Sequence, residues 1–114
     1  MRVLICGGRS FDDYRRLEAE LDALHAQYRF SLVIHGGARG ADSFAGHWAF
    51  SRHIDVMKVP AQWKRYGNRK AGPIRNAEML TKEPELVIAF SGGNGTADMV
   101  RKAVAANVPV IELP

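Results

Sequence analysis

Short runs of hydrophobic residues recur along the chain, and four of them end just before a glycine or a proline. The runs are continuous rather than alternating in polarity, and they are rich in β-branched residues. Such runs are typical of strands that are buried on both faces of a parallel sheet. The pattern therefore predicts five strands, at residues 3–6, 32–35, 56–59, 86–90 and 108–111.

Between these runs the hydrophobic residues recur at spacings of three and four, which predicts amphipathic helices. The stripes lie at residues 14–28, 41–49 and 99–104. Ser10 and Asp13 precede the first stripe in the arrangement of a capping box, which favours a helix start there. The chain thus alternates between strand and helix.

Residues 60–75 are expected to be irregular, because Pro60, Gly67, Gly72 and Pro73 interrupt any regular element. Elsewhere no hairpin dipeptide separates the predicted strands, so crossover connections through helices are expected. The sequence therefore predicts an α/β fold, a single Rossmann-like three-layer domain with a parallel sheet of about five strands flanked by helices. A length of 114 residues leaves room for one domain, 1–114.

The formal net charge is +4 and the pI is about 9.6, which favours anionic partners without choosing among them. The apolar run that ends at Cys6 is too short for a signal peptide or a membrane span, so we expect a cytoplasmic protein without membrane contact. Cys6, the single cysteine, has no disulfide partner. His25, His47 and His53 lack metal-ligand spacing, and we expect neither a metal nor another cofactor.

Glycine pairs follow three of the predicted strands, at residues 7–8, 36–37 and 92–93. Turns at the carboxyl ends of parallel strands lie on one edge of the sheet, where α/β proteins bind ligands. Glycine lets the backbone approach an anion, which free N–H groups and the helix dipole then stabilise. The candidate ligand-binding residues in these turns are Gly7, Gly8, Arg9, Ser10, Gly36, Gly37, Arg39, Gly40, Asp42, Gly92, Gly93, Asn94, Gly95 and Thr96.

Arginines gather near the same connections, and a guanidinium is well suited to bidentate contact with phosphate. Arg9 and Arg39 lie in the first two turns, and Arg75 is a further candidate ligand contact. Asn76, which follows Arg75, could bind a base, a sugar or a neighbouring loop. The candidate pocket is therefore electropositive.

Three further residues each allow two interpretations. Asp42 could cap the second helix or accept a hydrogen bond from a ribose hydroxyl. Trp63 could stack on a base as part of a flap over the pocket, or it could pack into the core. His35 could act as an acid or base, or it could be a hydrogen-bonded structural residue.

The order of five motifs along the chain is more specific than any one of them. It resembles the YspA/YpsA-related branch of the SLOG superfamily over nearly the whole chain, through the segments 7–9, 36–42, 60–63, 71–79 and 92–96. The resemblance implies a Rossmann-like domain that binds a nucleotide or a nucleotide-derived small molecule. It also implies a homodimer that associates through helices flanking the pocket.

The related LOG enzymes cleave the N-glycosidic bond of nucleoside monophosphates with an arginine and a glutamate. The resemblance places Arg75 at the arginine position, but Met99 stands where the glutamate is expected. A thioether cannot stabilise the oxocarbenium-like charge that forms as the base leaves. Asp98 is the nearest carboxylate, rotated by about 100° on a helix, so the candidate catalytic residues are Arg75 and Asp98.

Three functions follow. The first is a sensor or binding module for a nucleotide-derived ligand, and the second is a nucleotide hydrolase in which Asp98 or Asp42 replaces the missing glutamate. The third is binding of single-stranded nucleic acid, by resemblance to the DprA proteins of the wider superfamily. The sequence weakens the third, because no predicted helix carries a stripe of lysine and arginine.

Overall fold

Five parallel strands alternate with four helices in the computed structural model, which describes residues 1–114. The strand order is β3-β2-β1-β4-β5, and every neighbouring pair is parallel. This confirms the predicted Rossmann-like α/β fold. The strands are β1 (Arg2–Cys6), β2 (Leu32–His35), β3 (Asp55–Lys58), β4 (Leu86–Phe90) and β5 (Val110–Leu113). The last strand begins two residues later than predicted, after Pro109, whose carbonyl accepts a hydrogen bond from Val87 N at 2.9 Å.

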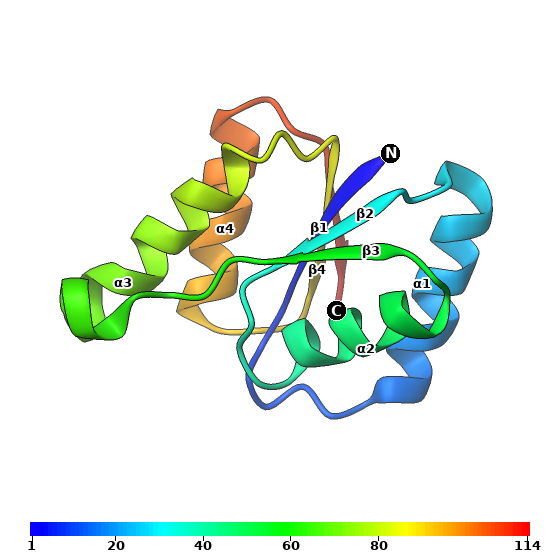
Figure 1. The fold of residues 1–114 in the computed structure, drawn as a ribbon, viewed down its shortest axis with the longest axis horizontal. Helices are drawn as coiled ribbons and strands as arrows, with labels where there is room; N and C mark the ends of the chain where they lie inside the picture. Colours follow the sequence, from blue (N-terminus) through cyan, green and yellow to red (C-terminus); the bar gives the residue numbers. More distant parts are fainter.

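Helices cover both faces of the sheet, which is why the central strands are uniformly apolar. On one face lie α1 (Tyr14–Tyr28) and α2 (Ala41–Ser51), and on the other lie α3 (Trp63–Leu80) and α4 (Asn94–Ala105) (Figure 1). Alternate residues of β1 face the two layers. Val3 and Ile5 belong to the cluster that includes Leu17 and Trp48, while Leu4 and Cys6 pack with Met79 and Met99.

Asp13, and not Ser10, is the N-cap residue of the first helix. The Asp13 carboxylate accepts a hydrogen bond from the backbone N–H of Arg16 at 3.1 Å. The predicted capping box is therefore wrong, because the helix starts at Tyr14 and leaves Ser10 in the preceding turn. One side chain is sufficient to cap the first turn.

Helix α3 occupies most of the segment that was expected to be irregular. Gly67 adopts φ 82° and ψ 172°, so the helix kinks there and continues to Leu80. A positive φ of this kind is accessible to glycine at little cost. Pro73 lies soon after the kink and removes a single N–H donor from the helix. The glycine and proline signals thus mark a bend, not a loop.

Helix α3 packs mainly against α4 and reaches well beyond the sheet (Figure 1). No helix in the chain combines the length and the apolar character needed to cross a bilayer.

Each helix is followed by a residue in the left-handed conformation, on the edge of the sheet where the strands begin. These residues are Arg29, His53, Glu83 and Asn107, with φ between 58° and 61°. None of them is a glycine, although that conformation costs other residues about 1–2 kcal/mol. All four lie on the edge opposite the glycine-rich turns.

Candidate functional site

The glycine-rich turns after β1, β2 and β4 meet at the carboxyl edge of the sheet. We call them the β1 turn (7–10), the β2 turn (36–40) and the β4 turn (91–93). Gly8 N donates to Ser91 O at 2.9 Å, which joins the β1 and β4 turns at the point where the strand order reverses. Gly8 O accepts a hydrogen bond from Ala41 N at 3.2 Å, which joins the β1 turn to the start of α2. This is where open α/β sheets hold their ligands.

Gly40 is the residue that permits the second of these contacts. It has φ 78° and ψ −128°, and a Cβ atom on it would overlap the carbonyl oxygen of Gly8. Only glycine fits a positive φ together with so close a backbone approach. The β1 and β2 turns therefore touch through their main chains.

A pocket of about 670 Å³ opens beside these turns and extends under α3 and α4. This volume lies within the range typical of small-molecule sites. Twelve of the residues predicted from the sequence line it: Gly7, Gly8, Arg9, Asp42, Trp63, Arg75, Asn76, Gly93, Asn94, Gly95, Thr96 and Asp98. The structure therefore brings most of the predicted site into one cavity.

The first turn of α4 contributes three pocket residues whose backbone N–H groups are unpaired. Asn94, Gly95 and Thr96 line the cavity, and their amides have no acceptor within the chain. Gly93, the N-cap residue, provides no side-chain cap. Unpaired amides at a helix N-terminus, together with the positive end of its dipole, favour a bound anion.

The first three amides of the β2 turn are already paired within the chain, contrary to expectation. Gly36 N and Ala38 N donate to one carboxylate oxygen of Asp42 at 3.1 and 3.3 Å, and Gly37 N donates to His35 Nδ1 at 3.0 Å. Asp42 thus holds the turn closed and does not cap its helix, whose N-cap residue is Gly40. Both hydrogen bonds go to Oδ2, so Oδ1 keeps its acceptor capacity at the pocket wall, where a ribose hydroxyl could donate to it.

Asp42 and Arg75 both contact Gly36 in the β2 turn. Burial raises the pKa of Asp42, against the hydrogen bonds from the turn and the charge of Arg75. Burial likewise lowers the pKa of Arg75, which nonetheless stays protonated at neutral pH. Arg75 Nη1 donates to Gly36 O at 2.7 Å, so the arginine also braces the turn.

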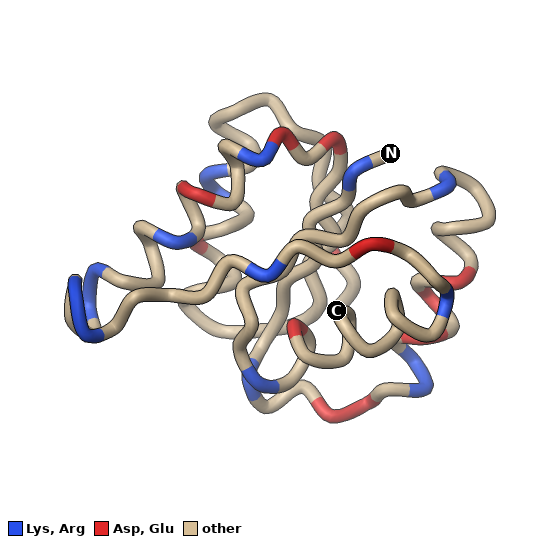
Figure 2. Tube along the Cα trace, in the orientation of Figure 1, with Lys and Arg blue, Asp and Glu red and all other residues tan.

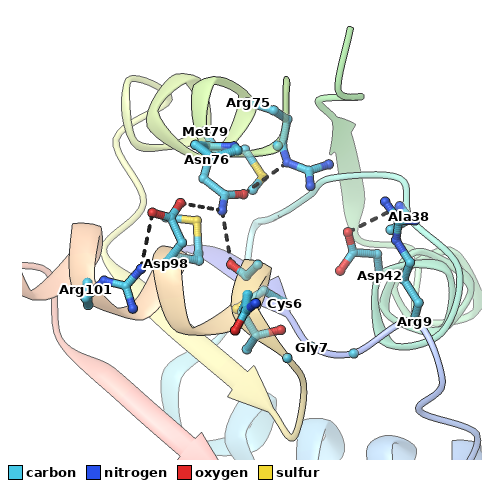
Figure 3. Close-up of a pocket in the computed structure, with 18 of the residues that line it drawn as sticks. Cys6, Gly7, Arg9, Ala38, Asp42, Arg75, Asn76, Met79, Asp98 and Arg101 are labelled. Atoms are coloured by element: carbon cyan, nitrogen blue, oxygen red, sulfur yellow. Dashed lines mark hydrogen bonds and ion pairs between the residues drawn. The ribbon is translucent and has the colours of Figure 1, made fainter. Parts of the chain in front are cut away.

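A line of polar side chains runs from Arg75 along the pocket wall to α4 (Figure 3). Arg75 Nε donates to Asn76 Oδ1 at 3.0 Å, and Asn76 Nδ2 donates to Asp98 Oδ2 at 3.0 Å and to Gly95 O at 3.1 Å. Asn76 is buried, so its contacts to a neighbouring element are structural. It orients Arg75 and Asp98 toward the same cavity.

Asp98 lines the pocket despite its rotation relative to Met99. Burial raises the pKa of Asp98, but hydrogen bonds from Lys102 and Asn76 outweigh it, so the pKa lies below its usual range. Lys102 Nζ lies 2.6 Å from Asp98 Oδ1. Met99 is buried in the core beneath the cavity. The pocket wall thus carries the carboxylate of Asp98 next to Met99, which stands at the expected glutamate position.

Trp63 begins α3 at the mouth of the pocket and is 40% exposed. Packing into the core is therefore the wrong interpretation of this residue. The guanidinium of Arg9 lies 5.4 Å from the centre of the indole ring. Such a distance is typical of a cation–π contact.

A family model described as the YspA, cpYpsA-related SLOG family matches residues 1–66. A similar protein, the Gene 61 protein of Mycobacterium phage D29, is 38% identical over 118 residues, which cover 96% of this chain and 94% of the phage protein. The chain belongs to the YspA, cpYpsA-related SLOG family. The resemblance drawn from the order of the motifs is thereby confirmed.

Among solved structures, glycinamide ribonucleotide transformylase 1 from Symbiobacterium toebii is similar to this family member with 17% identity and a TM-score of 0.48. The match covers 78% of this chain and 40% of the transformylase chain. This chain therefore spans less than half the length of that enzyme.

Several predicted residues lie outside the pocket: Ser10, Gly36, Gly37, Arg39, Gly40 and Gly92. Gly36 and Gly40 hold the turns together instead, and His35 is buried against the same turn with its pKa lowered by burial and by Lys58 and Arg75. Sequence reasoning missed other lining residues: Cys6, Ala38, Asn68, Arg69, Gly72, Pro73, Met79, Met99 and Arg101. Five of them lie on α3, whose helical continuity was concealed by its glycines and Pro73.

Proposed function

We propose that this chain is a binding module for a nucleotide or a nucleotide-derived phosphate ligand, acting in the cytoplasm. The observation that carries the proposal is the trio of unpaired amides in the first turn of α4, open to the pocket. A phosphate group there would accept from Asn94, Gly95 and Thr96 and would lie at the positive end of the helix dipole.

The charges around the cavity support the same ligand. Arg9, Arg69, Arg75 and Arg101 line it, against two carboxylates. Asp98 is paired with Lys102, and Asp42 accepts from two backbone amides, so the four arginines leave an excess of positive charge around the pocket. Guanidinium groups bind phosphate oxygens in bidentate fashion.

Trp63 provides a surface for the base. Its ring is partly exposed at the pocket mouth and already has Arg9 against it. Base stacking on an aromatic side chain contributes about 1–3 kcal/mol. With the phosphate at α4 and the base at Trp63, one nucleotide would contact two helices that line the same cavity.

Thermal unfolding with nucleoside phosphates, ADP-ribose and cyclic dinucleotides tests the proposal. A ligand present at a hundred times its dissociation constant adds about 2.7 kcal/mol to the free energy of unfolding. The sharpest variant is Asn94→Pro, which removes one unpaired amide at the first helical position, where proline is tolerated. Loss of a hydrogen bond to a charged group should cost about 1.5–3 kcal/mol of binding free energy.

The matched control is Asn94→Ala, which keeps the backbone N–H. We expect Asn94→Pro to weaken binding strongly and Asn94→Ala to leave it close to wild type. Absence of any thermal shift, or equal binding by the two variants, would refute the phosphate site. Light scattering on the same samples tests the expected homodimer.

Hydrolysis of the ligand is a second candidate, favoured by the position of Asp98 on the same wall as Arg75. Water would attack C1′ of the ribose, the N-glycosidic bond would break, and the base would leave with the proton. Ionised Asp98 would stabilise the positive charge that develops on the sugar. Release of free base from nucleoside monophosphates tests this, and turnover that survives both Arg75→Ala and Asp98→Asn would exclude these roles.

A further inference from the structure

The positive charge of this protein is concentrated on one helix. Helix α3 contains five Lys and Arg residues and one acidic residue, Glu78, so it carries the whole formal net charge of +4. The rest of the chain is electrically balanced. The distribution overturns the expectation that no helix bears a cationic stripe, which followed from treating residues 60–75 as irregular.

Four of these cations lie in the first half of α3, which we call the α3 arm (residues 63–70). Lys64, Arg65, Arg69 and Lys70 are all exposed, and none of their side chains makes an ion pair or a hydrogen bond within the chain. Figure 2 shows them gathered at the end of the helix that projects from the sheet. Nothing in the molecule neutralises this end.

Two aromatic rings lie among these cations. Trp63 is partly exposed, and the guanidinium of Arg65 lies 5.0 Å from the centre of the Tyr66 ring. Exposed rings interleaved with cations are typical of surfaces that bind unpaired nucleic-acid strands, whose free bases stack on the rings. A duplex keeps its bases stacked on each other and cannot use them in this way.

The arm also continues into the pocket. Trp63, Asn68 and Arg69 line the cavity, whereas Lys64, Arg65 and Lys70 do not. An anionic strand on the arm would therefore pass the pocket mouth. A lipid surface fits less well, because Trp63 and Tyr66 are the only large apolar side chains of the arm and a membrane-bound helix needs a broad apolar face.

We propose that the α3 arm binds single-stranded nucleic acid, with Lys64, Arg65, Arg69 and Lys70 on the phosphates and Trp63 against a base. This surface shares Trp63 and Arg69 with the small-ligand pocket of the proposed function, whereas Lys64, Arg65 and Lys70 lie outside the pocket. It recognises the backbone and the flat face of the bases, so no sequence preference is expected.

Salt dependence measures the number of phosphate contacts directly. For single strands the slope of log K against log salt is about −0.7 per contact, so four contacts predict an affinity loss of about 50-fold between 50 and 200 mM salt. The probes are fluorescently labelled oligo-dT and oligo-U, followed by anisotropy. A flat response over this range overturns the proposal with the unmodified protein alone.

A triple variant locates the surface. Lys64→Gln, Arg65→Gln and Lys70→Gln together remove three charges outside the pocket and should make the slope shallower by about 2. The control, Arg15→Gln, Arg29→Gln and Lys82→Gln, removes the same charge from residues without side-chain partners elsewhere and should change the slope little. Equal effects of the two triples would mean general electrostatics and would overturn the assignment. Thermal unfolding of both triples checks that they fold.

Two more measurements distinguish this proposal from binding of other partners and from the small-ligand site. Duplex DNA and vesicles containing phosphatidylserine should bind more weakly than the single strand, and tighter binding of either overturns the choice of partner. Asn94→Pro should leave oligonucleotide binding intact while it weakens the small ligand, so the failure of one proposal is distinguishable from the failure of the other.

Discussion

Replacement of Gly40 by alanine should separate the β1 and β2 turns. The new Cβ would meet the carbonyl oxygen of Gly8, which is backbone and cannot rotate away. It would also place an L-residue at φ 78° and ψ −128°. The steric overlap and the strained backbone would both move the two turns apart. The hydrogen bond from Ala41 N to Gly8 O would then break.

The expected loss of stability is the sum of three effects. Backbone strain contributes about 1–3 kcal/mol, overpacking contributes about 1–3 kcal/mol, and the lost hydrogen bond contributes about 1 kcal/mol. Because the chain can relax by moving the turns, we take about 3 kcal/mol as the expected decrease. The moved turns would also distort the pocket wall formed by Gly7 and Gly8.

Urea unfolding at neutral pH measures this decrease. Gly95→Ala is the matched control, since a Cβ there meets nothing within 4 Å and the residue lies in the first turn of α4. Alanine should stabilise that helix by about 0.5–1 kcal/mol. A decrease below about 1 kcal/mol for Gly40→Ala would show that the turns are not held by this contact.

Two other predictions concern groups whose pKa is shifted. Because burial raises the pKa of Asp42, the folded chain binds this proton more tightly than the unfolded chain. The resulting stability is complete below the ordinary aspartate pKa and is lost as the pH rises through the raised value. The stability of Asp42→Asn should therefore increase relative to wild type as the pH rises. Urea midpoints of both proteins from pH 3 to 7 check this, and a difference in stability that stays constant with pH would contradict it. Burial raises the pKa of Cys6 to about 12, so iodoacetamide at pH 8 should label it in urea but not in the native protein; rapid native labelling, read by mass spectrometry, would contradict its burial.

Much of the fold could be predicted because its signals are local. The continuous apolar runs of β1, β2 and β4 identify strands buried on both faces, and their glycine pairs mark the carboxyl edge. The place of the pocket follows, since those ends of parallel strands meet. The motif order added the family, which single turns could not specify.

The hydrogen-bond partners within the site could not be predicted from the sequence. The sequence shows that Asp42 follows the β2 turn, but only the structure shows that its carboxylate occupies the amides of Gly36 and Ala38. The structure also shows that the first turn of α4 leaves three backbone N–H groups unpaired at the pocket. In α3, Gly67 interrupts the helical backbone as its local preference suggests, yet the helix continues past Pro73 to Leu80 while it packs against α4.

The four left-handed residues after the helices imply that robustness and recognition can be tuned separately. Arg29, His53, Glu83 and Asn107 lie at the edge where strands begin, about 16 Å from the carboxyl edge for a strand of five residues. Glycine at such positions would relieve torsional strain without touching the cavity. Selection for higher stability could therefore act on the edge where the strands begin, while selection for a new ligand acts on the carboxyl edge.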